Sequence, residues 1–180
     1  MLDNLRQDAA RLAAVKGGRI ARSTIEGLLF ENGFQAVVLH RVAHWFRRRG
    51  IPFFGPFFAR LNLFLTGVDI SPLAVIGPGL YISHGTGLVI GGAVRIGARA
   101  FLLQGVTLGA PTPARVAEMP TLGDDVFVGA GACIIGPIRV GSRVFVGVNS
   151  IVTRDVPDDS KVLSAATMEV IEVTPRGAPA

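Results

Sequence analysis

From Ile70 onward, an aliphatic residue returns at every sixth position of the chain, with two interruptions. Gly follows this lead position in eight of thirteen units, and the fifth position is usually small or apolar. A sustained repeat of this kind indicates stacked structural units, each of which buries its apolar face against its neighbours. The thirteen lead residues are all Ile, Leu or Val: Ile70, Ile76, Ile82, Ile90, Ile96, Leu102, Leu108, Leu122, Val128, Ile134, Val140, Val146 and Val152.

Six residues are enough for one short strand and one corner, so three units close a triangular coil. The lead aliphatic residue would point inward and stack on its equivalent in the next coil, about 4.8 Å away. Gly suits corners where a side chain would clash or where φ is unusual. A β-sandwich would instead show a period of two and more variable strand spacing. The sequence therefore predicts a mainly β fold, a parallel β-helix of hexapeptide repeats, over residues 67–160.

The two interruptions of the repeat predict loops. Leu88 and Val89 are interpreted as a short insertion just after His84, and residues 114–121 as a longer one. Insertions in a solenoid leave the coil as loops, often on the functional face. We therefore expect chemistry near both interruptions.

Residues 1–66 predict an α-helical segment in front of the repeat. One helix is expected to end at Gly50 and Pro52, and a second apolar segment opens at Pro56 and ends near Thr66. Residues 161–180 are expected to form a C-terminal tail, disordered from Thr174. The first helix carries an apolar stripe at helical spacing: Phe34, Val37, Val38, Val42, Trp45 and Phe46.

Composition narrows the class of protein. Its 180 residues suit one domain with an accessory segment. The single cysteine, Cys133, excludes a disulfide framework and a Cys-based metal cage, and favours a reducing cytoplasm. The chain begins with no signal-peptide pattern. The apolar stretch 51–65 is too short, and too interrupted by prolines, to span a bilayer.

The net charge of +5 is unevenly distributed, and it leaves two interpretations of one region. Arg41, Arg47, Arg48 and Arg49 precede a Phe-rich stretch at residues 53–64. The plainer interpretation is a helical pair that buries its aromatic rings against itself or a neighbouring subunit. The alternative is peripheral contact with the inner face of a membrane. The modest basic excess and the lack of a motif argue against nucleic acid as a partner.

Three histidines are the candidates for acid–base or metal chemistry. His40 and His44 lie one helical turn apart without a third ligand, so a helix-surface role is expected and no metal site. His84 is the only histidine of the repeat, which excludes the three-histidine metal site of hexapeptide-repeat carbonic anhydrases. One imidazole can serve as a general base, with Asp69 as its orienting partner. A corner histidine that merely bonds backbone is the alternative.

Four segments together resemble the serine acetyltransferases, members of the left-handed β-helix acyltransferases. They are Gly-Val-Asp-Ile-Ser-Pro (67–72), Ile-Gly-Pro-Gly (76–79), Ser-His-Gly-Thr-Gly (83–87) and Val-Thr-Leu-Gly (106–109). The similarity covers about residues 34–157. It implies that Asp69 and His84 form a catalytic dyad, that the acceptor hydroxyl attacks acetyl-CoA directly, and that no metal takes part. It also implies a homotrimer with a cofactor groove between subunits, contacted at Gly109, Ala110, Ala130 and Val148.

The departures from this family fall on the positions that would recognise the acceptor. Ser83 replaces an aspartate, Ser71 replaces a histidine, and Glu118 and Met119 replace Arg-His in the long loop. Glu118 should repel the carboxylate of an amino acid, and Met119 offers no donor. We therefore expect a neutral acceptor, such as a sugar of a surface polysaccharide precursor. The alternatives are serine acetylation in cysteine biosynthesis and a non-catalytic β-helix scaffold.

Overall fold

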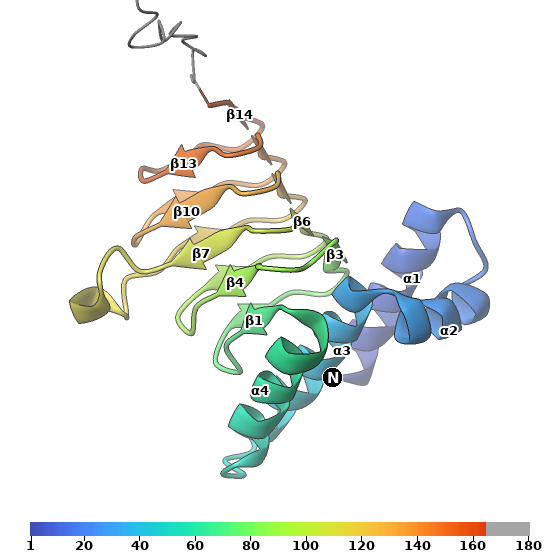
Figure 1. The fold of residues 1–180 in the computed structure, drawn as a ribbon. Helices are drawn as coiled ribbons and strands as arrows, with labels where there is room; N and C mark the ends of the chain where they lie inside the picture. Colours follow the sequence, from blue (N-terminus) through green and yellow to red (C-terminus); the bar gives the residue numbers. More distant parts are fainter. Residues whose placement is uncertain (165–180) are drawn as a thin grey trace, which may run out of the picture.

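The computed structural model describes residues 1–164 and shows a triangular parallel β-solenoid with four helices at one end (Figure 1). The predicted tail beyond residue 164 lies outside the described residues. The first sheet contains β1 (Asp69–Ile70), β4 (Val89–Ile90), β7 (Thr107–Gly109), β10 (Cys133–Ile135) and β13 (Ile151–Val152). The second contains β2 (Val75–Ile76), β5 (Arg95–Ile96), β8 (Thr121–Leu122) and β11 (Arg139–Val140). The third contains β3 (Tyr81–Ser83), β6 (Phe101–Leu103), β9 (Phe127–Val128), β12 (Phe145–Val146) and β14 (Lys161–Val162).

The core runs along the axis of the solenoid and is built from the repeat. All thirteen lead residues are buried, and they belong to one continuous cluster with the fifth-position residues such as Ala74 and Val106. Each fully buried aliphatic side chain contributes about 1.5–3 kcal/mol relative to exposure. The period of six therefore identified both the fold and its core, and the predicted hexapeptide-repeat solenoid is confirmed. The last strand, β14, extends this solenoid just past residue 160.

Glycines after the lead residue are required by close contact between coils. A Cβ atom at Gly77 would lie 2.5 Å from the carbonyl oxygen of Gly97, and one at Gly129 would lie 2.7 Å from the amide nitrogen of Val148. Neither distance is possible for a real Cβ atom. The glycine at this position therefore lets successive coils stack at hydrogen-bonding distance.

The spacing of paired residues locates the short insertion more accurately than the sequence did. Val89 pairs with Asp69, 20 positions earlier, whereas it pairs with Thr107 only 18 positions later. Leu88 is fully buried, so neither it nor Val89 leaves the coil. The two extra residues lie instead in the corner at 84–87, and the interpretation of Leu88 and Val89 as the insertion was wrong.

Four helices precede the solenoid: α1 (Leu2–Lys16), α2 (Ile20–Phe30), α3 (Asn32–Arg48) and α4 (Phe54–Thr66). The predicted interruption near Gly50 and Pro52 is confirmed, and Gly50 adopts a φ of 67° there. Helix α4 begins at Phe54, slightly before the expected Pro56. Among residues 1–164, no helix is long and apolar enough to cross a bilayer.

Helix α3 approaches the first coil unusually closely because its second residue is a glycine. A Cβ atom at Gly33 would lie 2.0 Å from the carbonyl oxygen of Ile82 in β3. The end of β3 leads directly into the corner that carries His84. Helix α3 therefore packs directly against the strand that leads into the His84 corner.

Candidate active site

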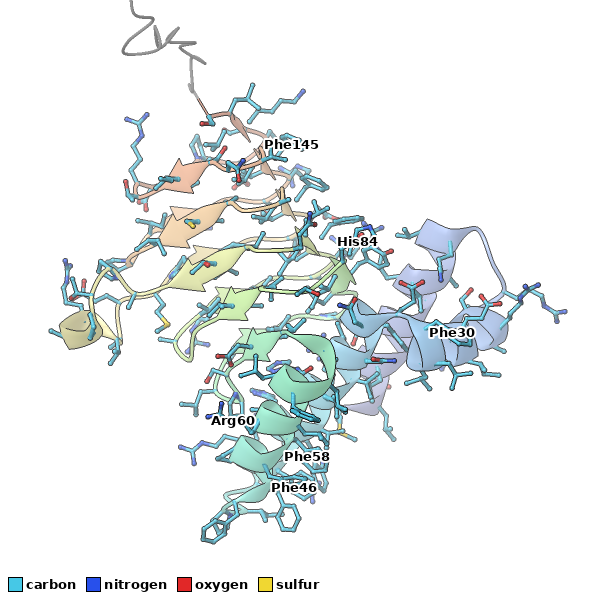
Figure 2. The ribbon with its side chains drawn as sticks, in the orientation of Figure 1. Phe30, Phe46, Phe58, Arg60, His84 and Phe145 are labelled. Atoms are coloured by element: carbon cyan, nitrogen blue, oxygen red, sulfur yellow. The ribbon has the colours of Figure 1, made fainter. Side chains whose placement is uncertain are left out.

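His84 lies on an exposed corner that is longer than its equivalents. This corner, between β3 and β4, contains four residues, 84–87. The same corner in later coils contains only two: 104–105, 130–131 and 148–149. His84 is exposed and has a φ of 53°, in the left-handed region that few non-Gly residues adopt. Figure 2 shows the His84 label at this edge of the solenoid. The extra length lets the imidazole stand clear of the packed wall.

The His84 corner is held by backbone contacts to its neighbours. The Gly87 amide donates to the Gly67 carbonyl at 2.8 Å, and the Gly105 amide donates to the Thr86 carbonyl at 3.1 Å. Asn32 of α3 donates its side-chain amide to the Thr86 hydroxyl at 3.3 Å. The corner is thereby joined to the coil below, the coil above and the helical segment, which fixes where the imidazole emerges.

Asp69 begins β1, the strand paired with the β4 strand that follows the His84 corner. Its side chain points outward and borders a cleft of about 310 Å³ between α4 and the first coil, together with Arg60 and Ser71. Among the described residues, no hydrogen bond joins the Asp69 carboxylate to the His84 imidazole. The two predicted catalytic groups thus lie on adjoining coils, and their direct contact stays a prediction.

The expected cofactor positions lie along both edges of the first sheet. Ala130 and Val148 occupy the same corner column as His84, since the Asn149 amide donates to the Ala130 carbonyl at 2.8 Å. Gly109 ends β7 at the opposite edge, and Ala110 follows it. The outward column between these edges is Asp69, Val89, Thr107, Cys133 and Ile151.

This face of the first sheet suits an elongated ligand. Gly109, Ala110 and Ala130 have minimal side chains, so a ligand could reach the backbone there. Val148 is 62% exposed and Ile151 is 75% exposed, which leaves apolar surface uncovered in the isolated chain. The small residues and the apolar surface suit the predicted acyl-CoA cofactor, whose binding along this face stays a prediction.

The long loop differs from expectation at Glu118. Its carboxylate accepts a hydrogen bond from the Nε of Arg115 at 2.9 Å, and a second contact joins Arg115 Nη2 to the other carboxylate oxygen. The hydrogen bond from Arg115 also lowers the pKa of Glu118 below its usual value. The predicted repulsion of an acceptor carboxylate by Glu118 ignored this partner. The i,i+3 spacing of Arg and Glu around the short helix η1 (Pro113–Arg115) was the signal.

Met119 packs against the solenoid, whereas Ser83 is only half-buried at the end of a strand. The Met119 sulfur accepts the Ala93 amide at 3.3 Å, and it occupies space that a Cβ atom on Gly91 would need. Met119 thus presses against the coil wall. Ser83 ends β3 opposite Leu103 and is half-buried.

His40 and Arg41 are both buried, and the helix-surface role expected for His40 was wrong. His40 is 1% exposed, and neither ring nitrogen finds a partner among the described residues. Burial lowers the pKa of His40 to about 3. His44 differs, because its Nδ1 lies 3.0 Å from the Pro72 carbonyl. Within residues 1–164, no three His, Cys, Asp or Glu side chains are placed to hold a metal ion.

Comparison with known proteins gives one consistent result, although no family model matches the chain. Serine acetyltransferase from Synechococcus elongatus is 44% identical over 143 residues, which cover 79% of this chain and 59% of that protein. Serine acetyltransferase from Helicobacter pylori strain J99 is 41% identical over 145 residues, 81% of this chain and 85% of that protein. The crystal structure of Neisseria gonorrhoeae serine acetyltransferase in complex with serine superposes with a TM-score of 0.80 at 32% identity. That alignment covers 91% of this chain and 66% of the other.

Proposed function

Because this chain belongs to the serine acetyltransferase family, we propose that it transfers the acetyl group of acetyl-CoA to the hydroxyl of serine. The match to the Synechococcus protein spans only 59% of that protein, so the activity is inferred for this shorter chain. The proposal rests on the position of His84 in the solenoid. The His84 corner shares one edge of the solenoid with Ala130 and Val148, beside the face that fits acetyl-CoA.

In the proposed reaction, His84 accepts the proton of the acceptor hydroxyl as general base. The hydroxyl oxygen forms a bond to the thioester carbonyl carbon, and the bond from that carbon to sulfur breaks. The imidazolium then returns its proton to the departing thiolate, which leaves as CoA. Asp69 would orient the imidazole and stabilise its charged form. No acyl-enzyme forms, so Cys133 needs no nucleophilic role.

Serine is preferred over a sugar as the acceptor. The relatives are named serine acetyltransferase, and one related structure contains serine. The strongest argument for a neutral acceptor was the charge of Glu118, and its ion pair with Arg115 weakens that argument. Arg115 also supplies a guanidinium in the loop, where it could replace the missing Arg-His pair in binding a carboxylate.

A sugar hydroxyl remains the second candidate because of Met119 and Ser83. Met119 packs against the coil wall and offers no hydrogen-bond donor to a carboxylate. Ser83 carries no charge for an ammonium group. Both substitutions favour an acceptor with fewer charges than serine.

We also propose that a second copy of the chain completes the cofactor groove in a homotrimer. The exposed Val148 and Ile151 on the first sheet support this assembly, since apolar side chains at an edge favour burial in an interface. The scaffold alternative finds no support in the enzyme family to which the chain belongs.

The test measures CoA release from acetyl-CoA with serine in one reaction and a panel of free sugars in others. Rapid release with serine alone supports the proposal. Release with a sugar and none with serine would overturn the choice of acceptor while keeping the acetyltransferase. Lack of turnover with every acceptor, together with no thermal shift by CoA, would favour the scaffold.

A further inference from the structure

Helix α4 exposes an apolar stripe that no described part of the chain covers. Phe53, Phe57 and Phe64 are 83%, 58% and 83% exposed. Phe57, Arg60 and Phe64 recur at intervals of three and four residues, so they share one helix face. Phe53 precedes the helix with a φ of 70° and extends the exposed aromatic surface at the helix start. Single exposed apolar residues are ordinary on a protein surface, but several exposed aromatic rings on one element, interleaved with a cation, mark an interaction site.

The opposite face of α4 is already used for packing. Gly55, Asn62 and Thr66 are buried there, and the Asn62 side chain donates to the Ala36 carbonyl of α3 at 3.1 Å. Phe46 and Phe58 stack between the helices with their rings 8° from parallel, and both lie near the end of the hairpin (Figure 2). The exposed stripe is therefore additional to the contact that holds the hairpin together.

The same hairpin carries uncompensated positive charge. Arg47, Arg48 and Arg49 are exposed at the end of α3, and the chain has no Asp or Glu between Glu31 and Asp69. No ion pair of the described residues involves these three arginines or Arg60. Arg49 lies 4.3 Å from the ring centroid of Trp45, an aromatic residue of the kind found at membrane interfaces.

Two clefts beside these arginines could receive acidic headgroups. One, of about 440 Å³, is lined by Trp45, Arg48 and Arg49, and the other, of about 520 Å³, by Arg47, Arg48 and Arg95. Both clefts open between α3 and the first coils. Their lining offers guanidinium groups that bind phosphate oxygens through paired hydrogen bonds.

We propose that the α3–α4 hairpin docks on an anionic phospholipid surface. The Phe53, Phe57 and Phe64 rings enter the headgroup–acyl boundary, and the three arginines bind lipid phosphates beside it. Basic residues next to exposed aromatic rings are the elements of an interfacial anchor. The hairpin projects beyond the solenoid (Figure 1), so it can reach a flat surface.

A second copy of this chain fits the hairpin less well. In a symmetric contact the same surface meets itself, which would bring Arg60 and its neighbours toward their own equivalents. A head-to-tail contact needs an acidic surface. Four acidic groups of the solenoid lie within ion-pair distance of Arg99 or Arg143: Asp124, Asp125, Asp158 and Asp159. Asp155 accepts the Arg139 amide, and Asp69 borders the same cleft as Arg60 of its own chain.

The test is cosedimentation of the full chain with vesicles of phosphatidylcholine alone or with phosphatidylglycerol added. We expect binding to the anionic vesicles, little binding to neutral ones, and loss at high salt. The Arg47→Gln/Arg48→Gln/Arg49→Gln variant should bind on the order of 100-fold more weakly, because each cation near an anionic surface contributes about 1 kcal/mol. The Phe53→Ser/Phe57→Ser/Phe64→Ser variant should also lose binding.

Matched control variants distinguish binding through the hairpin from nonspecific binding to vesicles. Phe30→Ser removes a ring that is 79% exposed on α2, and Arg154→Gln removes an exposed solenoid cation. Both should bind like the unchanged protein. The proposal is overturned if the unchanged protein ignores anionic vesicles at low salt, or if the controls lose as much binding as the hairpin variants. It is also overturned if light scattering shows that the Phe variant changes subunit number while vesicle binding is absent throughout.

Discussion

Arg41 of α3 donates two hydrogen bonds to the carboxylate of Asp8 in α1, at 2.9 and 3.1 Å, with both side chains buried. The same carboxylate accepts the amides of Gly79 and Leu80, while Arg41 also donates to the carbonyls of Ile76 and Gly77. One ion pair thus joins two helices to the first coil. Every charged atom in it has a partner, which is the condition under which a buried pair is tolerated.

Removing one member of this pair should be costly. Asp8→Asn leaves the Arg41 guanidinium buried without its counter-charge, so we expect a loss of about 3–5 kcal/mol in the free energy of unfolding. Urea denaturation measures this loss. Asp3→Asn is the control, because Asp3 is exposed on the same helix, and it should change stability by less than about 0.5 kcal/mol. Equal stability of both variants would contradict a structural role for the pair.

Turnover should depend on His84 while stability does not. His84→Asn removes the proposed base, and asparagine tolerates the left-handed backbone at φ 53°. We expect CoA release to fall by about 10²–10⁴-fold, the usual contribution of a general base, with the melting temperature unchanged. A variant that melts earlier but turns over normally would instead make His84 a structural corner residue.

Asp69→Asn tests the orienting partner separately. An amide can still hold the imidazole but cannot stabilise its charged form. We therefore expect a smaller loss of turnover than for His84→Asn, with little change in KM for acetyl-CoA. Full activity of Asp69→Asn would remove Asp69 from the proposed dyad.

Acid should destabilise the protein through His40. Its folded pKa of about 3 lies below the unfolded value near 6.5, so the unfolded state binds the extra proton between these values. The contribution of His40 to the free energy of unfolding is fully present above pH 6.5. It is lost as the pH is lowered toward 3, at up to about 1.4 kcal/mol per pH unit. His40→Leu should remove this part of the slope and keep stability at pH 7.5, because it replaces an imidazole without hydrogen bonds by an apolar group. An unchanged pH slope in His40→Leu, measured by urea denaturation, would assign the acid sensitivity to other groups.

The long loop should contribute to acceptor binding through Arg115. Arg115→Ala is expected to raise KM for serine by about tenfold or more with a smaller effect on kcat, because a charged hydrogen bond contributes about 1.5–3 kcal/mol. KM for acetyl-CoA is the internal control and should stay constant. Glu118→Gln frees the guanidinium from its ion pair, so it should leave KM for serine unchanged or lower it. A raised KM in Glu118→Gln would contradict this role for Arg115.

The fold could be predicted from the sequence because each coil repeats the same local requirement. An inward aliphatic residue recurs every six positions, usually followed by a glycine, and no long-range information is needed to find this pattern. The Asp8–Arg41 pair could not be found this way, since its members lie in different helices and their burial depends on how those helices pack. His40 was misplaced for the same reason, because helical spacing alone does not tell which faces are covered.

For the candidate site, the sequence supplied candidate residues, whose roles stay predictions, and little of their geometry. Asp69 and His84 stand out as an unusual pair within the repeat, and resemblance assigned their roles. The environment of Glu118 required the loop conformation, which no repeat specifies. The sequence alone could not locate the insertion, because removing Leu88 and Val89 restores the six-residue period as well as removing two residues of the corner does. The strand pairing between Asp69 and Val89 resolves this ambiguity.

The two additional residues at the His84 corner have an evolutionary consequence. Deleting two codons there would restore a coil of 18 residues and draw the corner back into line with residues 104–105. The lead aliphatic residues on either side would keep their places, so the protein could still fold. A solenoid of this kind can therefore gain or lose a reactive loop by one small in-frame change, and closely related genes could encode an enzyme and an inert scaffold.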